Sequence, residues 1–361
     1  MRTFLRLPWR RCLSTSGASV RSLLELPSLS PAQSEKTHIA QGWIKGIRRL
    51  KKATFFHLDD GSSVHALQVV VLDEHLRNLP GLCFGSAVSV RGNLVASPSP
   101  QQPVELVATD IHIDSANDTE AHPFKVKQTV HPDQYRQHLH LRPRVERFAS
   151  MMRVRSAAAI AIHEFFRENE FFLVHTPVLT TNDAEGGGEA FSVTVANKEK
   201  EKNKAEEEFF GSPASLTVSG QLHLESAAYG LKRAYNFNPA FRAERQQSRR
   251  HLSEFWMVEA EMAFLDNFDG LLFWMENMLK SVTEKVLQTA AADFKYHMDH
   301  VAPKNHTALI EKMAESSFVR VPYDEAMRIL EKHSMQFNTP PKVGSLDSLN
   351  FSAAQIKSKY C

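Results

Sequence analysis

The chain has 361 residues, of which 42% are hydrophobic, and its formal net charge is +2 at pH 7. This length is sufficient for two ordinary domains, and the composition is typical of a globular protein. No apolar run approaches the roughly 18 residues of a membrane-spanning helix, so we expect no membrane partner. Because the net charge is small, contact with nucleic acid would have to come from local basic patches.

The first 24 residues are rich in arginine and hydroxyl side chains, and no acidic residue occurs before Glu25. This composition is typical of a mitochondrial transit peptide. The alternative is a basic leader that carries no targeting signal. We expect residues 1–24 to be a transit peptide and the protein to be located in the mitochondrial matrix.

Residues 36–115 alternate short apolar runs with turn clusters, which predicts strands. The runs are His38–Ile47, Thr54–Leu58, Ala66–Leu72, Ala87–Val95 and Val104–Ile113. About five strands in about 75 residues favour a small closed barrel of the OB-fold type, and the alternative is a small sandwich.

Neither the cysteines nor the histidines predict a metal site. The three cysteines are far apart and show no CxxC spacing, so we also expect no disulfide framework. Four histidines fall in residues 116–143, namely His122, His131, His138 and His140. Because prolines interrupt that segment and no cysteine lies nearby, we favour a solvated linker over a metal site.

Residues 144–342 mix helical and strand patterns, which predicts an α+β domain. Apolar residues recur at helical spacing from Phe148 to Phe166, which predicts a helix there. The same spacing predicts helices over Phe268–Leu287 and Tyr323–His333. Phe171–Leu179 reads as a strand, and its Pro177 would place it at a sheet edge or a bulge. Strands alternating with turns are expected from Leu216 to Phe264, and residues 343–361 form a divergent polar tail.

Residues 241–261 carry the strongest chemical pattern, in which two strand-like runs flank an arginine-rich loop. Such a hairpin can hold ATP, with Arg242 on the α-phosphate, where charge builds up during adenylate formation. Phe255 would offer its ring to adenine, and Arg250 and His251 would reach the outer phosphates. The alternative is an ordinary surface loop held by ion pairs.

The order Phe-Arg-x-Glu, loop, Arg-His-x-x-Glu-Phe and Glu-x-Glu resembles motif 2 of class II aminoacyl-tRNA synthetases, in the subgroup that charges Asp, Asn and Lys. This resemblance implies ATP-dependent aminoacylation of tRNA, with Arg242 and Glu244 as catalytic residues and Mg²⁺ assisting on the phosphates. Pro177 resembles the motif 1 proline at the dimer interface of that class, which implies a homodimer. The barrel is similar to the anticodon-binding domain of the subgroup.

Two further segments resemble the amino-acid site of that subgroup. Glu185 opens a glycine-rich stretch like the loop that closes over the amino acid, and the resemblance implies that it binds the α-ammonium group. Residues 219–225 resemble the pocket strand of asparaginyl enzymes, with Ser219, Gln221 and Glu225 as binding residues. Aspartyl enzymes carry a lysine where Leu224 stands here.

An amide side chain offers donors and needs an acceptor such as Glu225, whereas a carboxylate needs a cation. Two carboxylates about 4 Å apart would repel each other by ~4 kcal/mol at an effective dielectric near 20, which is about a thousandfold in affinity. We therefore place asparagine above aspartate as the substrate.

In the barrel, Phe55 and Gln68 are candidates for stacking on an anticodon base and hydrogen-bonding to it. Phe56 competes with Phe55, since adjacent strand residues face opposite ways, and both rings could instead be core. A nearby basic run suits tRNA phosphates and consists of Lys45, Arg48, Arg49, Lys51 and Lys52. The implied partner is tRNA(Asn).

The resemblance ends near Lys342. The third motif of the class, which supplies an arginine for the γ-phosphate and acidic Mg²⁺ ligands, is not recognisable after it. We therefore expect a truncated chain without metal ligands of its own, with marginal stability and little activity. The main hypothesis is an asparagine–tRNA ligase. The alternatives are an RNA-binding or dimerising module without chemistry and an aspartyl enzyme.

Overall fold

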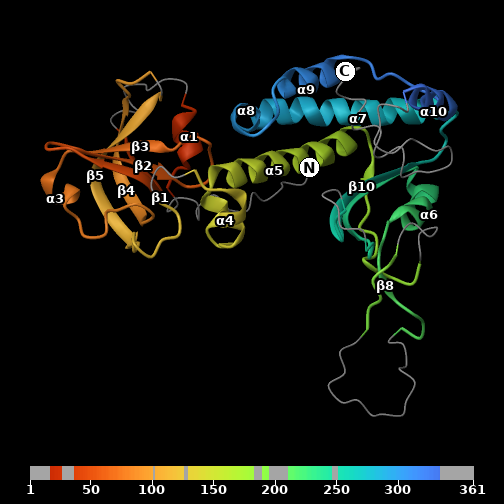
Figure 1. Ribbon diagram of the computed structural model, residues 1–361, viewed down its shortest axis with the longest axis horizontal. Coiled ribbons are helices and arrows are strands. Elements are labelled where there is room, and N and C mark those ends of the chain that lie inside the picture. The colour runs from red at the N-terminus through yellow and green to blue at the C-terminus, as the bar shows by residue number, and fades with distance from the viewer. Residues whose placement is uncertain are drawn as a thin grey trace, which may run out of the picture. The chain divides into compact units, whose positions relative to one another are not determined.

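The computed structural model describes residues 17–26, 36–100, 102–125, 129–182, 189–194, 210–245 and 251–333 (Figure 1). The chain divides into two compact units. The first comprises the chain up to Ala157 together with Val286–Thr307, and the second comprises Ala158–Lys285 and the chain from Ala308 onward. Each unit is described by itself below.

The first unit contains a closed five-stranded barrel with the strand order β1-β2-β3-β5-β4. The β3–β5 pair is parallel and the other pairs are antiparallel. The strands are β1 (Thr37–Arg49), β2 (Thr54–Asp59), β3 (Leu67–Val71), β4 (Ala87–Ala96) and β5 (Val104–Ser115), with the short helix α3 (Glu74–Arg77) after β3. The barrel confirms the predicted OB-fold and excludes the sandwich.

Alternation along β2 decides which side chains fill the barrel. Phe56 and Leu58 point inward and are fully buried, whereas Phe55 and His57 lie on the outer side. Close packing of the strands also restricts Gly92 on β4, where a Cβ atom would lie 2.2 Å from the carbonyl oxygen of Val107. A side chain at this position would therefore push β4 and β5 apart.

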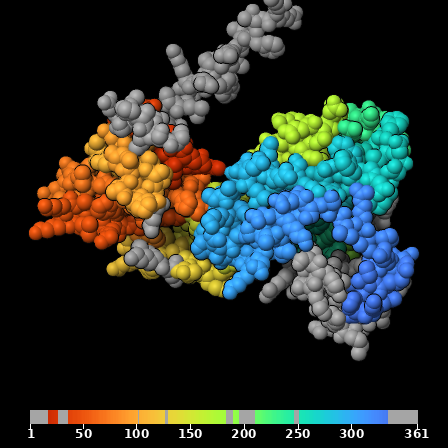
Figure 2. Space-filling model, turned by 90° about the horizontal axis from the view of Figure 1, so that it is seen from above, coloured from red at the N-terminus to blue at the C-terminus, as the bar shows by residue number. Residues whose placement is uncertain are grey.

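Helix α1 (Val20–Leu24) packs against the barrel, and in Figure 2 its red atoms lie against the orange atoms of the barrel. Val20 and Leu23 are 1% and 2% exposed and belong to the barrel core. The backbone N–H of Val20 donates to Asp60 at 2.9 Å, and Gly17 leaves no room for a Cβ beside the Ile39 carbonyl oxygen. The predicted transit-peptide boundary at residue 24 therefore falls within α1, whose apolar side chains are part of the barrel core.

The described residues of the predicted linker, 116–125 and 129–143, belong to the first unit and are more ordered than a solvated linker. It contains α4 (Pro132–Arg136) and a 3₁₀ turn, η2 (Arg142–Arg144). Phe124, Tyr135 and Leu141 form a small core of their own. The prolines that suggested a linker include Pro132, which begins α4, where a missing N–H costs nothing.

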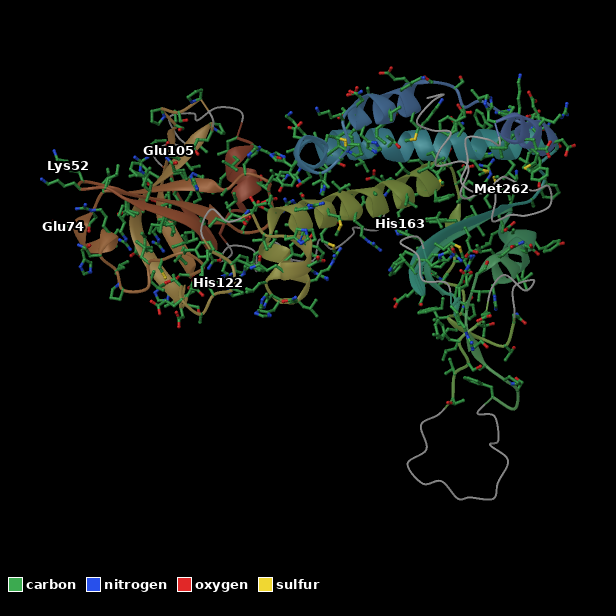
Figure 3. All side chains as sticks on the ribbon, in the orientation of Figure 1. Lys52, Glu74, Glu105, His122, His163 and Met262 are labelled. Atoms are coloured by element: carbon green, nitrogen blue, oxygen red, sulfur yellow. The ribbon has the colours of Figure 1, made fainter. Side chains whose placement is uncertain are left out.

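The second unit is built on a three-stranded sheet in the order β10-β9-β6. Its strands are β6 (Phe172–Leu173), β9 (Arg233–Phe241) and β10 (Glu254–Met262), and a smaller pair joins β7 (Leu179–Thr180) to β8 (Ser215–Leu216). An aromatic cluster holds α5 (Glu146–Glu168) on this sheet, with the Phe166 and Tyr235 rings stacked at 4.2 Å. Figure 3 locates two other members of this region, His163 on α5 and Met262 on β10.

Two sequence expectations in this unit are wrong. Phe171–Leu179 is not one strand, because residues 174–178 between β6 and β7 are irregular, and Pro177 is exposed in this irregular segment. The expected strand after Ser219 is instead α6 (Gln221–Leu231). Leucine, alanine and glutamate in this segment favour a helix, and this local preference prevails.

The predicted helices near the end are present as α7 (Phe268–Thr289) and α10 (Tyr323–Lys332). Between them lie α8 (Ala291–His300) and α9 (His306–Glu315), which the sequence patterns did not predict. None of the helices within the described ranges is long and apolar enough to cross a membrane.

The docking of α1 predicts a stability effect. Replacing Leu23 with alanine removes a buried side chain and should destabilise the protein by about 2–4 kcal/mol. Urea unfolding of the whole chain, followed by circular dichroism, measures this change. Ser22→Ala on the exposed side of the same helix is the matched control and should change little. Equal unfolding midpoints for Leu23→Ala and Ser22→Ala would show that α1 does not stabilise the barrel.

Candidate functional site

The β9–β10 hairpin carries the residues of the arginine-rich pattern. The two strands pair antiparallel from Arg233 opposite Met262 to Phe241 opposite Glu254. Beyond the pair, the N–H of Arg242 donates to the Ser253 carbonyl at 3.1 Å, so the hairpin continues into its loop. The predicted strand–loop–strand arrangement is therefore present.

The Arg242 guanidinium lies 5.4 Å from the centre of the Phe255 ring. Its Nε atom is buried and has no hydrogen-bond partner among the described residues. A buried N–H without a partner costs free energy, and an anionic oxygen of a ligand would remove that cost. Arg242 and Phe255 are thus placed together as a cation beside an aromatic face.

The other predicted ATP-binding residues are only partly located. The Glu244 carboxylate lies 3.6 Å from Nε2 of His251, so these two side chains face each other across the loop. Arg250 lies outside the described residues, and so does Glu185 with its glycine-rich stretch. Glu189, just after that stretch, accepts a hydrogen bond from the backbone N–H of Ala243 at 2.6 Å. The chain that follows Glu185 therefore returns to the hairpin.

The predicted amino-acid residues lie at the start of α6. Gln221 donates from Nε2 to Glu225 at 3.0 Å, one helical turn further on. Leu224 lies on the buried face of α6 and is fully buried. Gln221 and Glu225 thus form one hydrogen-bonded pair, while Leu224 contributes no charge to the site.

Glu259 on β10 holds the start of α6 in place. Its carboxylate accepts from the Ser219 hydroxyl and from the backbone N–H of Gly220 at 2.9 Å. It also accepts from the Asn236 amide on β9 at 2.9 Å, and Asn236 in turn donates to Thr176 at 3.1 Å. Any side chain at Gly220 would collide with this network, since a Cβ there would lie 2.2 Å from Asn236 Nδ2.

Three carboxylates gather beside α6: Glu225, Glu259 and Glu261. Burial raises the pKa of Glu261, and the charges of Glu225 and Glu259 raise it further. Such a cluster attracts an ammonium group and repels a carboxylate. Glu259 and Asn236 were not recognised as binding residues in the sequence, although they lie opposite each other in the β9–β10 register.

On the barrel, Phe55 and Gln68 both line a cavity of about 810 Å³ on its outer face. Lys45, Arg48 and His57 line it as well. Because Phe56 is buried in the core, Phe55 is the ring available to a base. An aromatic ring, an amide and cations on one open face are the groups that bind single-stranded RNA.

The Gln68 amide is held by a buried carboxylate that the sequence did not reveal. Gln68 donates from Nε2 to Glu105 at 3.0 Å, and Ser97 and Gln102 donate to the same oxygen. Figure 3 marks Glu105 on the barrel. One of the two N–H donors of Gln68 is thus committed to the protein, which fixes the amide and leaves its oxygen and second N–H for a base.

The described part of the chain contains no group of three or more His, Cys, Asp or Glu side chains arranged to hold a metal ion. The acidic cluster beside α6 therefore does not fit a resident divalent cation. Glu225 and Glu259 accept hydrogen bonds from Gln221 and Asn236, and both repel the Glu261 carboxylate electrostatically.

Two family models match this chain. The first, described as class II tRNA synthetases (D, K and N), matches residues 131–349. The second, described as an OB-fold nucleic acid binding domain, matches residues 39–114. Together they cover both units.

Curated relatives are similar over most of the chain. The asparaginyl-tRNA synthetase of Mus musculus is 43% identical, over 84% of this chain and 62% of its own length. The asparagine–tRNA ligase of Microcystis aeruginosa is 40% identical, over 86% of this chain and 68% of its own length. The chain thus spans about three fifths of the mouse protein.

Among solved structures, an asparaginyl-tRNA synthetase from Pyrococcus horikoshii complexed with asparaginyl-adenylate superposes with a TM-score of 0.74. It is 23% identical and covers 94% of this chain and 72% of its own. An aspartyl enzyme from Entamoeba histolytica gives a TM-score of 0.63 at 18% identity, over 100% of this chain and 72% of its own. At these identities the likeness shows the fold.

The raised pKa of Glu261 predicts a pH dependence of stability. A carboxyl group whose pKa is higher in the folded state binds its proton more tightly there, so its ionisation opposes folding as the pH rises from about 4.5 through the folded pKa. Replacing Glu261 with glutamine removes this pH-dependent decrease in the free energy of unfolding. Thermal unfolding should therefore show that Glu261→Gln gains more relative to wild type at pH 7.5 than at pH 4.5.

The control is Glu254→Gln, an exposed glutamate on the same strand, which should show no such dependence. A constant difference between wild type and Glu261→Gln across this range would contradict the prediction.

Proposed function

The chain belongs to the class II tRNA synthetases of the D, K and N group, and within this family we propose that it is an asparagine–tRNA ligase. The observation that carries this assignment is the Gln221–Glu225 pair, whose carboxylate is part of the acidic cluster with Glu259 and Glu261. This cluster offers acceptors to an amide and repels a carboxylate. The aspartyl alternative is less supported, because Leu224 is buried and brings no cation to the site.

The proposed reaction has two steps. The asparagine carboxylate attacks the α-phosphorus of ATP, which releases pyrophosphate and leaves asparaginyl-adenylate. A terminal ribose hydroxyl of tRNA(Asn) then attacks the acyl carbon, and AMP leaves. Arg242, with its unpaired buried Nε beside Phe255, is suited to neutralise charge at the α-phosphate, so positioning and electrostatics do the catalysis.

Mg²⁺ would supply further charge neutralisation on the ATP phosphates. Since the described side chains offer it no cluster of ligands, we propose that it arrives with the nucleotide. The expected absence of the third motif concerns residues 343–361, which lie outside the described residues, so weak activity of this chain stays a prediction.

We also propose a homodimer in which the exposed break after β6 lies at the interface. Pro177 is exposed there, together with the large apolar side chains of Phe172, Leu173 and Leu179. Exposed apolar groups of this size on one segment favour a protein contact. Sedimentation equilibrium that finds only monomer at micromolar concentration would argue against this assembly.

The asparagine assignment predicts a binding preference. The chain should bind a non-hydrolysable asparaginyl-adenylate analogue at least a hundredfold more tightly than the aspartyl analogue, because Glu225 repels the side-chain carboxylate of the aspartyl group. Glu225→Gln removes that charge and should reduce the preference at least tenfold. Isothermal titration with both analogues measures it.

Ser226→Ala, at an exposed position on the same helix, is the matched control and should keep the full preference. Equal binding of the two analogues by wild type would sink the asparagine assignment. An unchanged preference in Glu225→Gln would move the discrimination to another residue.

We propose a mitochondrial location from the arginine-rich composition of residues 1–24. We expect the cleavage to fall before Gly17, because Val20 and Leu23 belong to the barrel core. The full chain fused to a fluorescent protein should enter mitochondria, and mass spectrometry should find a mature N-terminus upstream of Gly17. Cytosolic fluorescence, or cleavage after Leu24, would contradict this.

A further inference from the structure

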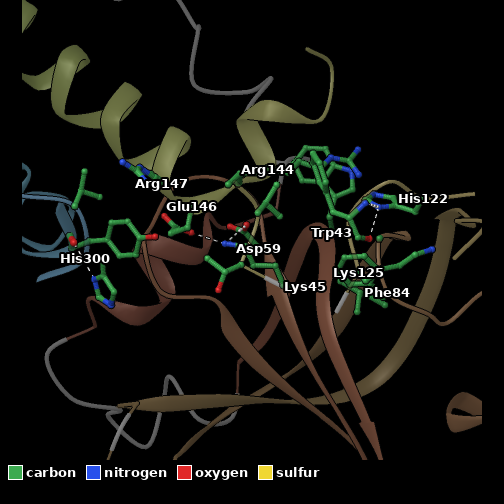
Figure 4. A pocket seen from close by; sticks show the side chains of 18 residues that line it. Trp43, Lys45, Asp59, Phe84, His122, Lys125, Arg144, Glu146, Arg147 and His300 are labelled. Carbon is green, nitrogen blue, oxygen red and sulfur yellow. Dashed lines mark hydrogen bonds and ion pairs between the residues drawn. The ribbon is translucent and has the colours of Figure 1, made fainter. Parts of the chain in front are cut away.

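A second cavity, of about 490 Å³, lies wholly within the first unit and has no role in the function proposed so far (Figure 4). We name it the Arg144 cavity. Its aromatic wall consists of Trp43, Phe84, Phe124 and Tyr296, and its charged side chains are Lys45, Asp59, Lys125, Arg144, Glu146 and Arg147. A volume of this size, with apolar walls and a few polar groups, is typical of a ligand site.

Both carboxylates of the cavity, Asp59 and Glu146, are paired with cations. Lys45 lies between Asp59 and Glu146, at 2.8 and 2.5 Å, as Figure 4 shows. Glu146 also binds Arg153 at 2.5 Å. The carboxylates of this cavity therefore already have cationic partners.

The Arg144 guanidinium stacks on Trp43, with 4.5 Å between its central carbon and the ring centre. Its side chain makes no hydrogen bond or ion pair with any residue in the described ranges. Burial lowers the pKa of Arg144, which expresses the cost of a charge removed from water. A half-buried, planar group with unused N–H donors is suited to two oxygens of a phosphate.

The composition of the lining selects an anion with an aromatic part. Four cationic side chains face the cavity against two carboxylates, so its electrostatic field favours negative charge. The Phe84 and Phe124 rings both contact the His122 imidazole edge-on, at 5.2 and 5.8 Å, and the three rings form one wall. Aromatic walls bind nucleobases with little regard to their identity.

The Arg144 cavity adjoins the Phe55 face through β1. Lys45 lines both cavities, and Trp43 stands two residues earlier on the same strand. The register of β1 shifts between Ile44 and Gly46, so Lys45 lies at a bulge in the strand. Because the two cavities share Lys45 as a lining residue, adjacent nucleotides of one RNA strand can occupy them.

We propose that the Arg144 cavity binds one nucleotide of the same RNA strand whose neighbouring base stacks on Phe55, with its phosphate on Arg144 and its base against the Phe84–Phe124 wall. This inference rests on the proposed tRNA binding and adds a second contact to it. Trp43 holds the guanidinium plane in place from behind, so Arg144 presents its donors in a fixed direction.

The test measures binding of a fluorescently labelled anticodon stem–loop of tRNA(Asn) to the full chain by anisotropy over a series of salt concentrations. Arg144→Ala should weaken binding about tenfold and lower the slope of log K against log salt by about one, as loss of a phosphate contact does. Arg144→Lys keeps the charge but loses the planar fork, so it should restore the slope and only part of the affinity.

Two variants frame the result. Arg91→Ala removes an exposed cation on β4 that lines neither cavity, and it should change the affinity less than twofold. Phe55→Ala tests the face of the proposed function and should weaken binding by itself. Thermal unfolding shows whether each variant is folded. If Arg144→Ala is unfolded, Arg144→Lys is used for the test instead.

The outcomes separate the two proposals. Wild-type affinity and slope in both Arg144 variants, with weakened binding in Phe55→Ala, would overturn the Arg144 cavity as an RNA subsite and leave the proposed function intact. Two results would count against both proposals: every variant binds RNA as tightly as the wild type, or the wild type does not bind RNA. A titration with AMP gives a third result: AMP binding that requires Arg144, with RNA binding unchanged, would assign the cavity to a free nucleotide and overturn the RNA proposal.

Discussion

The carboxylate of Glu259 is the constraint on which the candidate amino-acid site depends. It accepts hydrogen bonds from Ser219, Gly220 and Asn236, and these donors come from the start of α6 and from β9. Removing the carboxylate would leave three donors without their partner, at about 1–3 kcal/mol for each that is buried. The position of Glu225, one turn into α6, follows from this anchorage, so the proposed preference for asparagine would depend on a residue that need not touch the substrate.

The same carboxylate has an electrostatic consequence. Glu225, Glu259 and Glu261 lie close enough for their charges to raise the pKa of Glu261. Burial and the two neighbouring carboxylates all act in the same direction on the pKa of Glu261. A site of this kind opposes folding by repulsion and gains most when a cation enters, which suits the ammonium group of an amino acid.

The sequence predicted the barrel well because alternation and turn residues act locally. It could not choose between Phe55 and Phe56, since that choice depends on which face of β2 meets the core. It missed α1, whose apolar residues lie in a segment with the composition of a leader. It also missed the partners of Gln68 and Asn236, because Glu105 and Thr176 are 37 and 60 residues away along the chain. Long-range pairs of polar groups leave no periodic signal.

The basic run on the barrel shows how such pairs change a functional interpretation. Lys45 is bound by two carboxylates, and Arg49 donates to the carbonyl groups of Arg77 and Leu82 at 2.5 and 2.7 Å. Burial lowers the pKa of Lys45, but Asp59 and Glu146 outweigh it and the pKa is raised, so its charge is retained and already neutralised. Arg48, Lys51 and Lys52 remain exposed. Since counterion release counts only cations that meet phosphates, this run would contribute about three charges to the salt dependence of the proposed RNA binding, while Lys45 and Arg49 bind groups of the protein.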